Sequence, residues 1–232
     1  MTTAYLADPT IKAEIIAHLE AHRAADQIVK GVYWEDGRGC AVGCSLESWR
    51  QARGLKQIDH GRHAIYNDIF GPGGEMLASL EDAIFEGLPN GAALDFPLRF
   101  AAAIRPGADV SRVGWQFLHW LLTDSTVNPD IDHPWVRDAV RQCAVVLVPL
   151  TKGEPSDTAA AMKAAMRAEA AAVRAPPEAI RAAEAAMWAA LAAARESKQR
   201  RAGARAAGLA AADARVEHVL MADKLISLLE AA

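Results

Sequence analysis

The alanine-rich C-terminal third constrains the fold of this chain more than any other feature. From Glu154 to the end, 31 of 79 residues are alanine, and Trp188 is the one aromatic residue among them. Alanine has the highest helix propensity and almost no side-chain freedom to lose. The segment therefore predicts long helices that pack closely through small side chains, against the body of the protein or against another subunit.

Proline and glycine interrupt this helical stretch. We expect a helix to end near residue 174, a break at Pro176-Pro177, and a second helical stretch that continues to Leu229. Gly203 and Gly208 weaken that second stretch, because glycine costs about 1 kcal/mol in a helix interior.

The first two-thirds of the chain is typical of shorter, capped helices. Asp8 followed by Pro9 is an N-cap signal, and apolar periodicity then predicts a helix over about residues 9–30. Asp36-Gly37 is a hairpin-turn signal and predicts one short hairpin or ordered loop. The predicted fold is all-α, with a compact helical bundle over residues 1–153 that carries the candidate site and an alanine-rich helical tail or hairpin over residues 154–232.

Composition and charge exclude several classes of protein. The formal net charge is −4 with a pI near 6, which argues against a broad surface that binds nucleic acid. We therefore do not expect a nucleic-acid partner. No apolar run is long enough to span a membrane, and the N-terminus lacks the pattern of a secretory signal. Three cysteines, an odd number, do not form a disulfide framework. The expected location is therefore the reducing cytoplasm.

A histidine and an aspartate interrupt the apolar face of the helix predicted over residues 9–30. His22 and Asp26 fall one turn apart among Ile15, Leu19 and Val29 on a helical wheel. Buried polar side chains must be hydrogen-bonded, paired or metal-bound. An Asp-oriented histidine is consistent with a general base or a metal ligand, and equally with a pair that only ties this helix to its neighbour.

Two cysteines follow the predicted hairpin. Cys40 and Cys44 have C-x3-C spacing, whereas the common zinc ribbons use C-x2-C and a second cysteine pair. A mixed zinc site with histidines is one interpretation. The other is that both thiols are small buried side chains, while Gly39 and Gly43 permit a close backbone approach.

Two further residues complete the candidate set. His63 lies at the edge of the apolar side of a helix predicted over about residues 58–70. Glu81 falls on the core face of a helix predicted over about residues 75–87, where a carboxylate needs a cation or a donor. The ligand-binding candidates are His22, Asp26, Cys40, Cys44, His63 and Glu81. If a metal is bound, all of these except Glu81 are candidate ligands. The sequence requires no cofactor.

The order of these motifs resembles a family of proteins of unknown activity found in bacteriophage and prophage-bearing bacterial genomes. The resemblance spans most of the chain and implies no catalytic roles; Asn67, where an acid is expected, and the longer segment around residues 49–53 depart from it. It is carried by Ala21-His22, Ala25-Asp26, Lys30-Gly31-Val32-Tyr33-Trp34, Gly37-x-Gly39-Cys40-Ala41-Val42-Gly43-Cys44, His63-x2-Tyr66, Leu80-Glu81-Asp82-x-Ile84-Phe85-Glu86-Gly87-Leu88-Pro89, Gly107-Ala108-Asp109-Val110-Ser111 and Ala222-Asp223-Lys224-Leu225-Ile226.

Two functions remain open at this point. The first is a phage-related, non-enzymatic protein that binds a ligand or a protein partner near His22, Asp26, Cys40 and Cys44, and self-associates through its alanine-rich tail. The second is a metal-dependent hydrolase with a His/Asp/Cys site inside the helical bundle.

Overall fold

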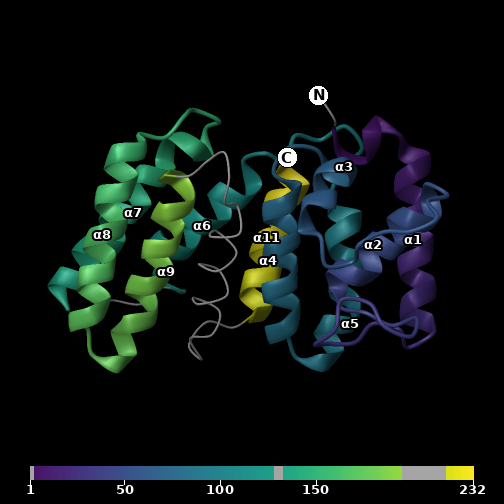
Figure 1. Cartoon of the computed structure of the whole chain (residues 1–232), viewed down its shortest axis with the longest axis horizontal. Helices are drawn as coiled ribbons and strands as arrows, with labels where there is room; N and C mark the ends of the chain where they lie inside the picture. Colours follow the sequence, from purple (N-terminus) through teal and green to yellow (C-terminus); the bar gives the residue numbers. More distant parts are fainter. Residues whose placement is uncertain (1–2, 128–132, 195–217) are drawn as a thin grey trace. The chain divides into compact units, whose positions relative to one another are not determined.

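The computed structural model describes residues 3–127, 133–194 and 218–232, and over these ranges the chain is all-α (Figure 1). The described ranges contain α-helices, two short 3-10 helices and two isolated β-bridges, but no extended strand. This confirms the predicted fold class.

The chain groups into two compact units, each with its own helices. Unit 1 contains the residues up to Val113 together with His218–Ala232. Within it α1 packs on α2 and α5, and the C-terminal α11 packs on α4 and α5. Its elements are η1 (Ala4–Ala7), α1 (Pro9–Ala24), α2 (Ala41–Ala52), η2 (His63–Ile65), α3 (Tyr66–Phe70), α4 (Gly74–Gly87), α5 (Asn90–Ala103) and α11 (His218–Ala231).

Helix α1 begins where the sequence predicts but ends earlier. The Asp8 side chain accepts a hydrogen bond from the Thr10 amide, and Pro9 occupies the first turn. The helix ends at Ala24, so the predicted extension to residue 30 is wrong. Asp26 follows in the left-handed conformation with φ of 53°. The amide of Gln27 then donates to the carbonyl of His22 and turns the chain away from the helix axis.

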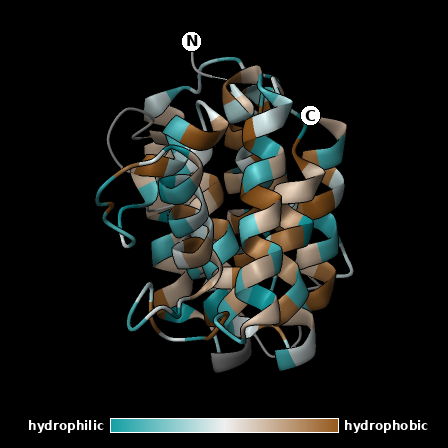
Figure 2. Ribbon diagram, turned by 90° about the vertical axis from the view of Figure 1, so that its right-hand side faces the viewer, coloured by the Kyte–Doolittle hydropathy of each residue, from teal (hydrophilic) through white to brown (hydrophobic). Residues whose placement is uncertain are grey.

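The predicted hairpin is a tight turn that leads into α2. Glu35 and Arg38 form an isolated antiparallel bridge around Asp36 and Gly37, both of which have positive φ. Hydrophilic and hydrophobic residues alternate along the helical ribbons, as expected for amphipathic helices (Figure 2).

The backbone of Tyr33 crosses the N-terminal turn of α2 at very close range. A Cβ placed on Gly43 would lie 1.4 Å from the carbonyl oxygen of Tyr33, and one on Gly39 would lie 2.1 Å from it. The amide of Cys40 donates to the carbonyl of Val32 at 2.7 Å and fixes the crossing. Glycine is therefore needed at both positions for the backbone to approach.

Unit 2 contains the described residues of Gly114–Glu217, and α7, α8 and α9 pack against one another within it. Their contacting faces are built from alanine, with Ala164, Ala168 and Ala186 among the buried residues. Its helices are α6 (Val113–Thr123), α7 (Pro134–Thr151), α8 (Thr158–Arg174) and α9 (Pro177–Ala194).

The compact units do not follow the division that composition predicts after residue 153. Helix α7 groups with the alanine-rich α8 and α9, because small side chains let all three approach closely, whereas α11 joins unit 1 through larger apolar residues such as Leu225 and Leu229. The predicted helix interruptions at Gly203 and Gly208 lie outside the described residues. No helix in the described ranges is both long and apolar enough to cross a membrane.

We expect Gly43→Ala to destabilise unit 1 by at least about 2 kcal/mol, because the new methyl group would overlap the Tyr33 carbonyl and force a backbone shift. Gly91→Ala is the matched control, since nothing lies within 4 Å of a Cβ at this position in α5. Urea unfolding followed by circular dichroism measures both variants. Equal midpoints for the two variants would contradict the close crossing.

Candidate functional site

The two cysteines of the C-x3-C motif follow the turn, as predicted, and lie at the N-terminal end of α2. Cys40 is the N-cap residue, and its thiol lies 3.5 Å from a carboxylate oxygen of Asp82. The thiol of Cys44 donates to the carbonyl of Gly39 at 3.4 Å and lies 3.9 Å from the carbonyl of Gln27. Both side chains are buried.

Burial makes both thiols poor nucleophiles. It raises the pKa of Cys44 to about 12, with a further contribution from the charge of Glu81. The pKa of Cys40 is also raised above its usual range, first by burial and then by Asp82. Since the thiolate is the reactive form, these are the properties of structural cysteines and not of catalytic ones.

His22 is buried as the helical pattern predicts, but its partner is Gln27 and not Asp26. The ring Nδ1 lies 2.6 Å from Oε1 of Gln27. Because that oxygen can only accept, Nδ1 is the donor of this hydrogen bond. Nε2 is buried and has no hydrogen-bond partner among the described residues. The ring of Trp34 meets the His22 ring edge to face, with centroids 5.3 Å apart.

Asp26 and His63 lie apart from the cysteines. Asp26 is exposed because the helix ends before it, so the predicted His22–Asp26 pair is wrong. Nδ1 of His63 makes a 2.9 Å hydrogen bond with the Ser79 hydroxyl, and its ring contacts that of Tyr33. His63 belongs to η2, since residues 53–62 form a loop in place of the start of the predicted helix over residues 58–70.

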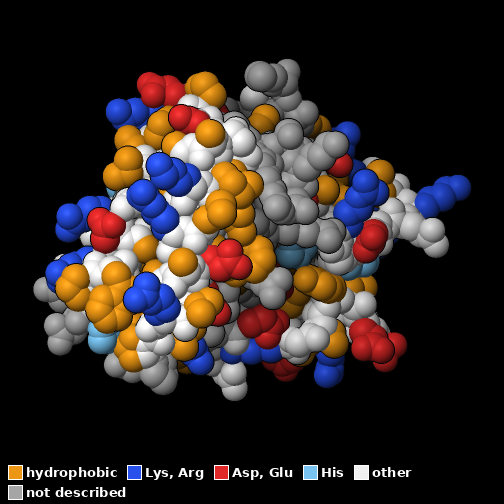
Figure 3. All heavy atoms as spheres, turned by 60° about the vertical axis from the view of Figure 1, so that its left-hand side comes forward, with side chains coloured by type: hydrophobic (Ala, Val, Ile, Leu, Met, Phe, Trp, Pro, Cys, Tyr) orange, Lys and Arg blue, Asp and Glu red, His pale blue; other side chains and the backbone are white. Residues whose placement is uncertain are grey.

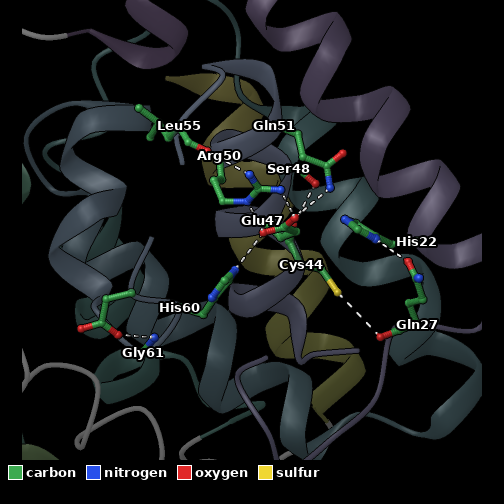
Figure 4. A network of polar contacts seen from close by, with 11 residues as sticks. His22, Gln27, Cys44, Glu47, Ser48, Arg50, Gln51, Leu55, His60 and Gly61 are labelled. Carbon is green, nitrogen blue, oxygen red and sulfur yellow. Dashed lines mark hydrogen bonds and ion pairs between the residues drawn. The ribbon is translucent and has the colours of Figure 1, made fainter. Parts of the chain in front are cut away.

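Glu47 on α2, which was not among the predicted site residues, makes polar contacts with several side chains of α2 and of the loop that follows it (Figure 4). Glu47 accepts two hydrogen bonds from the Arg50 guanidinium, at 2.7 and 2.8 Å, and others from Gln51 and His60. Burial alone would raise the pKa of Glu47, but these bonds together lower it to about 2. Arg50 also donates to the carbonyl of Leu55, so the network attaches the loop over residues 53–62 to α2.

Trp34 connects His22 to this network. Its ring stacks on that of His60 with centroids 5.2 Å apart and an angle of 15° between the planes. Beside this stack lies a pocket of about 620 Å³, lined by Trp34, Glu47, Arg50, Lys56, Gln57, Ile58, Asp59 and His60. The predicted residue His22 and the missed residues Trp34, Glu47 and His60 thus meet at one corner of unit 1, which we call the α2 corner.

Glu81 is fully buried, as its place on the core face of α4 predicts. One carboxyl oxygen accepts a 2.7 Å hydrogen bond from the Tyr66 hydroxyl, and the other has no partner among the described residues. Burial raises the pKa of Glu81 to about 8, and the nearby charge of Asp82 adds to the rise. Glu81 is therefore protonated at neutral pH and carries no charge that would need a cation.

The candidate metal ligands are not brought together. Within residues 3–127, 133–194 and 218–232, no three His, Cys, Asp or Glu side chains are arranged to hold a metal ion. His22 and Cys44 are linked only through Gln27, and Asp26 points to solvent. The candidate zinc site is thus not assembled by these residues.

No family model, curated protein or solved structure matches this chain in the comparisons made. The geometry of the site and the sequence motifs therefore carry the functional argument.

We expect the stability of unit 1 to fall with rising pH between about 4.5 and 8, because the unfolded chain releases the Glu81 proton that the folded chain retains. The free energy of unfolding should fall by up to about 1.4 kcal/mol per pH unit in this range. Glu81→Gln should abolish this component and be the more stable protein at pH 8. Urea titrations at several pH values measure it.

Glu86→Gln, on the exposed side of the same helix, is the control and should keep the slope. The groups that face Glu81 are the hydroxyl of Tyr66, the phenol of Tyr5, the thiol of Cys44 and the carboxylate of Asp82. All except Asp82 are neutral over this range, because their pKa values are raised. An unchanged slope in Glu81→Gln would show that another group is responsible.

Proposed function

We propose that this chain is a phage-related, non-enzymatic interaction protein that binds a peptide segment of a protein partner at the α2 corner. The observation that carries this proposal is the pocket of about 620 Å³ beside the Trp34–His60 stack. Its volume is in the range of small-ligand pockets, and it is a depression that is largely open to solvent.

The chemistry of the residues around the pocket favours binding over catalysis. The charge of Glu47 is already paired with Arg50, and its carboxylate also contacts Gln51 and His60. Its low pKa makes it a poor general base at neutral pH. The thiols nearby are buried with raised pKa values. A reducing, cytoplasmic location fits this proposal, because all three cysteines are free thiols.

A random-peptide array probed with the labelled full chain tests this function. The wild-type protein should retain a set of peptides that Trp34→Ala does not, because removing the indole removes one wall of the pocket. Trp135→Ala, a substitution of an exposed tryptophan in unit 2, is the matched control and should retain the same peptides. The proposal fails if nothing is retained, or if Trp34→Ala retains the same set while folded by circular dichroism.

The competing function, a metal-dependent hydrolase, predicts a different result. Elemental analysis of the purified chain would then find stoichiometric zinc or iron that His22→Ala loses, together with hydrolytic activity. No arrangement of the described residues favours this alternative.

We further propose that the chain self-associates through the outer side of α8. Met166 and Val173 lie two turns apart on this helix and are 64% and 83% exposed. The side of the molecule that comes forward in Figure 3, where α7 and α8 lie in Figure 1, carries apolar side chains interspersed with lysines and arginines. Exposed apolar side chains of this kind mark association surfaces when they are contiguous.

Light scattering of the full chain at increasing concentration tests the α8 surface. The wild-type mass should rise above that of one chain, and the double variant Met166→Glu/Val173→Glu should stay at one chain. Glu20→Lys, at an exposed position on α1, is the control and should behave as the wild type. A wild-type protein that remains a single chain at all concentrations would contradict this proposal.

A further inference from the structure

Positive charge is concentrated next to the α2 corner in a chain whose net charge is negative. Residues 47–63 contain the basic residues Arg50, Arg53, Lys56 and Arg62 against the acids Glu47 and Asp59, while the whole chain has a formal charge of −4. The segment consists of the end of α2 and the loop over residues 53–62 that the Glu47 network attaches to it.

Most of these basic side chains have no acidic partner. Arg50 pairs with Glu47, but Arg53, Lys56 and Arg62 form no ion pair with any carboxylate in the described ranges of the chain. Arg53 instead lies over the ring of Trp49, with its guanidinium carbon 5.4 Å from the ring centroid. Elsewhere in unit 1, Arg23 pairs with Asp95 and Arg99 pairs with Asp223, each within 3 Å.

The pocket exposes this charge to a ligand. Lys56 lines it together with Arg50, whose side chain remains 29% exposed although it pairs with Glu47. Of the two acids in the wall, Glu47 is held by Arg50 and His60, and Asp59 uses one oxygen to accept from the amide of Gly61. Lys56 and Asp59 are therefore the charges of the pocket wall that have no ion pair among the described residues. The excess of positive charge comes from Arg53 and Arg62 in the adjoining loop.

We propose that this pocket recognises an acidic segment of the partner protein, with a carboxylate placed against Lys56 and the neighbouring loop cations. This inference rests on the proposed function, because it specifies which peptides the α2 corner binds. Complementary charge of this kind steers association and selects among partners.

The same residues disfavour a nucleic acid at this pocket. Binding of single strands relies on aromatic faces on which bases stack, but one face of Trp34 is covered by His60 and the His22 ring meets Trp34 edge to face.

Fluorescence polarisation with the full chain and three labelled probes tests the proposal. The probes are a short peptide of alternating glutamate and leucine, the same peptide with glutamine in place of glutamate, and a single-stranded oligonucleotide of equal charge. The acidic peptide should bind the wild-type protein more tightly than the other two. Lys56→Glu/Arg62→Glu should weaken its binding by at least about tenfold at low salt. Arg105→Glu, an exposed charge reversal outside this segment of unit 1, is the control and should change it little.

The outcomes separate this inference from the proposed function. If the peptide array selects sequences that depend on Trp34 but are not enriched in Asp and Glu, the function stands and the acidic preference is overturned. If the glutamine peptide or the oligonucleotide binds as tightly as the acidic peptide, or if the charge reversal has no effect, the inference is also overturned. If the array selects nothing, the proposed function itself fails.

Discussion

The site depends on the crossing of the Tyr33 backbone over the first turn of α2. Gly39 and Gly43 allow this crossing because any larger residue would occupy the space of the Tyr33 carbonyl. The crossing places the next residue, Trp34, against the rings of both His22 and His60. Both thiols of the C-x3-C motif in the same segment are buried. The residues that resemble a metal or thiol motif in the sequence therefore serve a packing requirement of the backbone.

The sequence predicts the helical class and the interior of unit 1 well, because these depend on periodicity and propensity over many residues. Glu81 is buried as its position on the core face of α4 indicates, and Asp36-Gly37 forms the expected turn. The prediction fails at the end of α1. A helical wheel assumes that the helix continues, and no proline or glycine precedes Asp26 to end it. The left-handed conformation of Asp26 and the hydrogen bond from the Gln27 amide to the His22 carbonyl form a local helix-ending motif, which usually has glycine or asparagine at this position and which apolar periodicity does not reveal.

Glu47 and His60 were missed for a related reason. The pair formed by Glu47 and Arg50 has helical i, i+3 spacing and could have been read from a helix over residues 41–52. His60 joins them only because the loop over residues 53–62 folds back onto α2, and the two side chains are 13 residues apart in the sequence. Periodicity gives no register for such a loop. The pocket beside Trp34, which depends on the same loop, was equally beyond sequence reasoning.

Glu47 and Glu81, two of the carboxylates in and near α2, have opposite environments, and the difference favours a role of the corner in recognition. Glu81 lies in the apolar core and keeps its proton, so the interior beneath the motif is neutral. Glu47 is ionised, and its two oxygens accept hydrogen bonds from side chains of α2 and the loop. The part of the pocket wall around Glu47 is therefore already ordered without a ligand. A wall that is already ordered loses little conformational entropy on binding, which leaves more of the contact energy as affinity. The unpaired cations near this wall then favour ligands that carry a carboxylate, because a carboxylate can form ion pairs with them and a neutral group cannot.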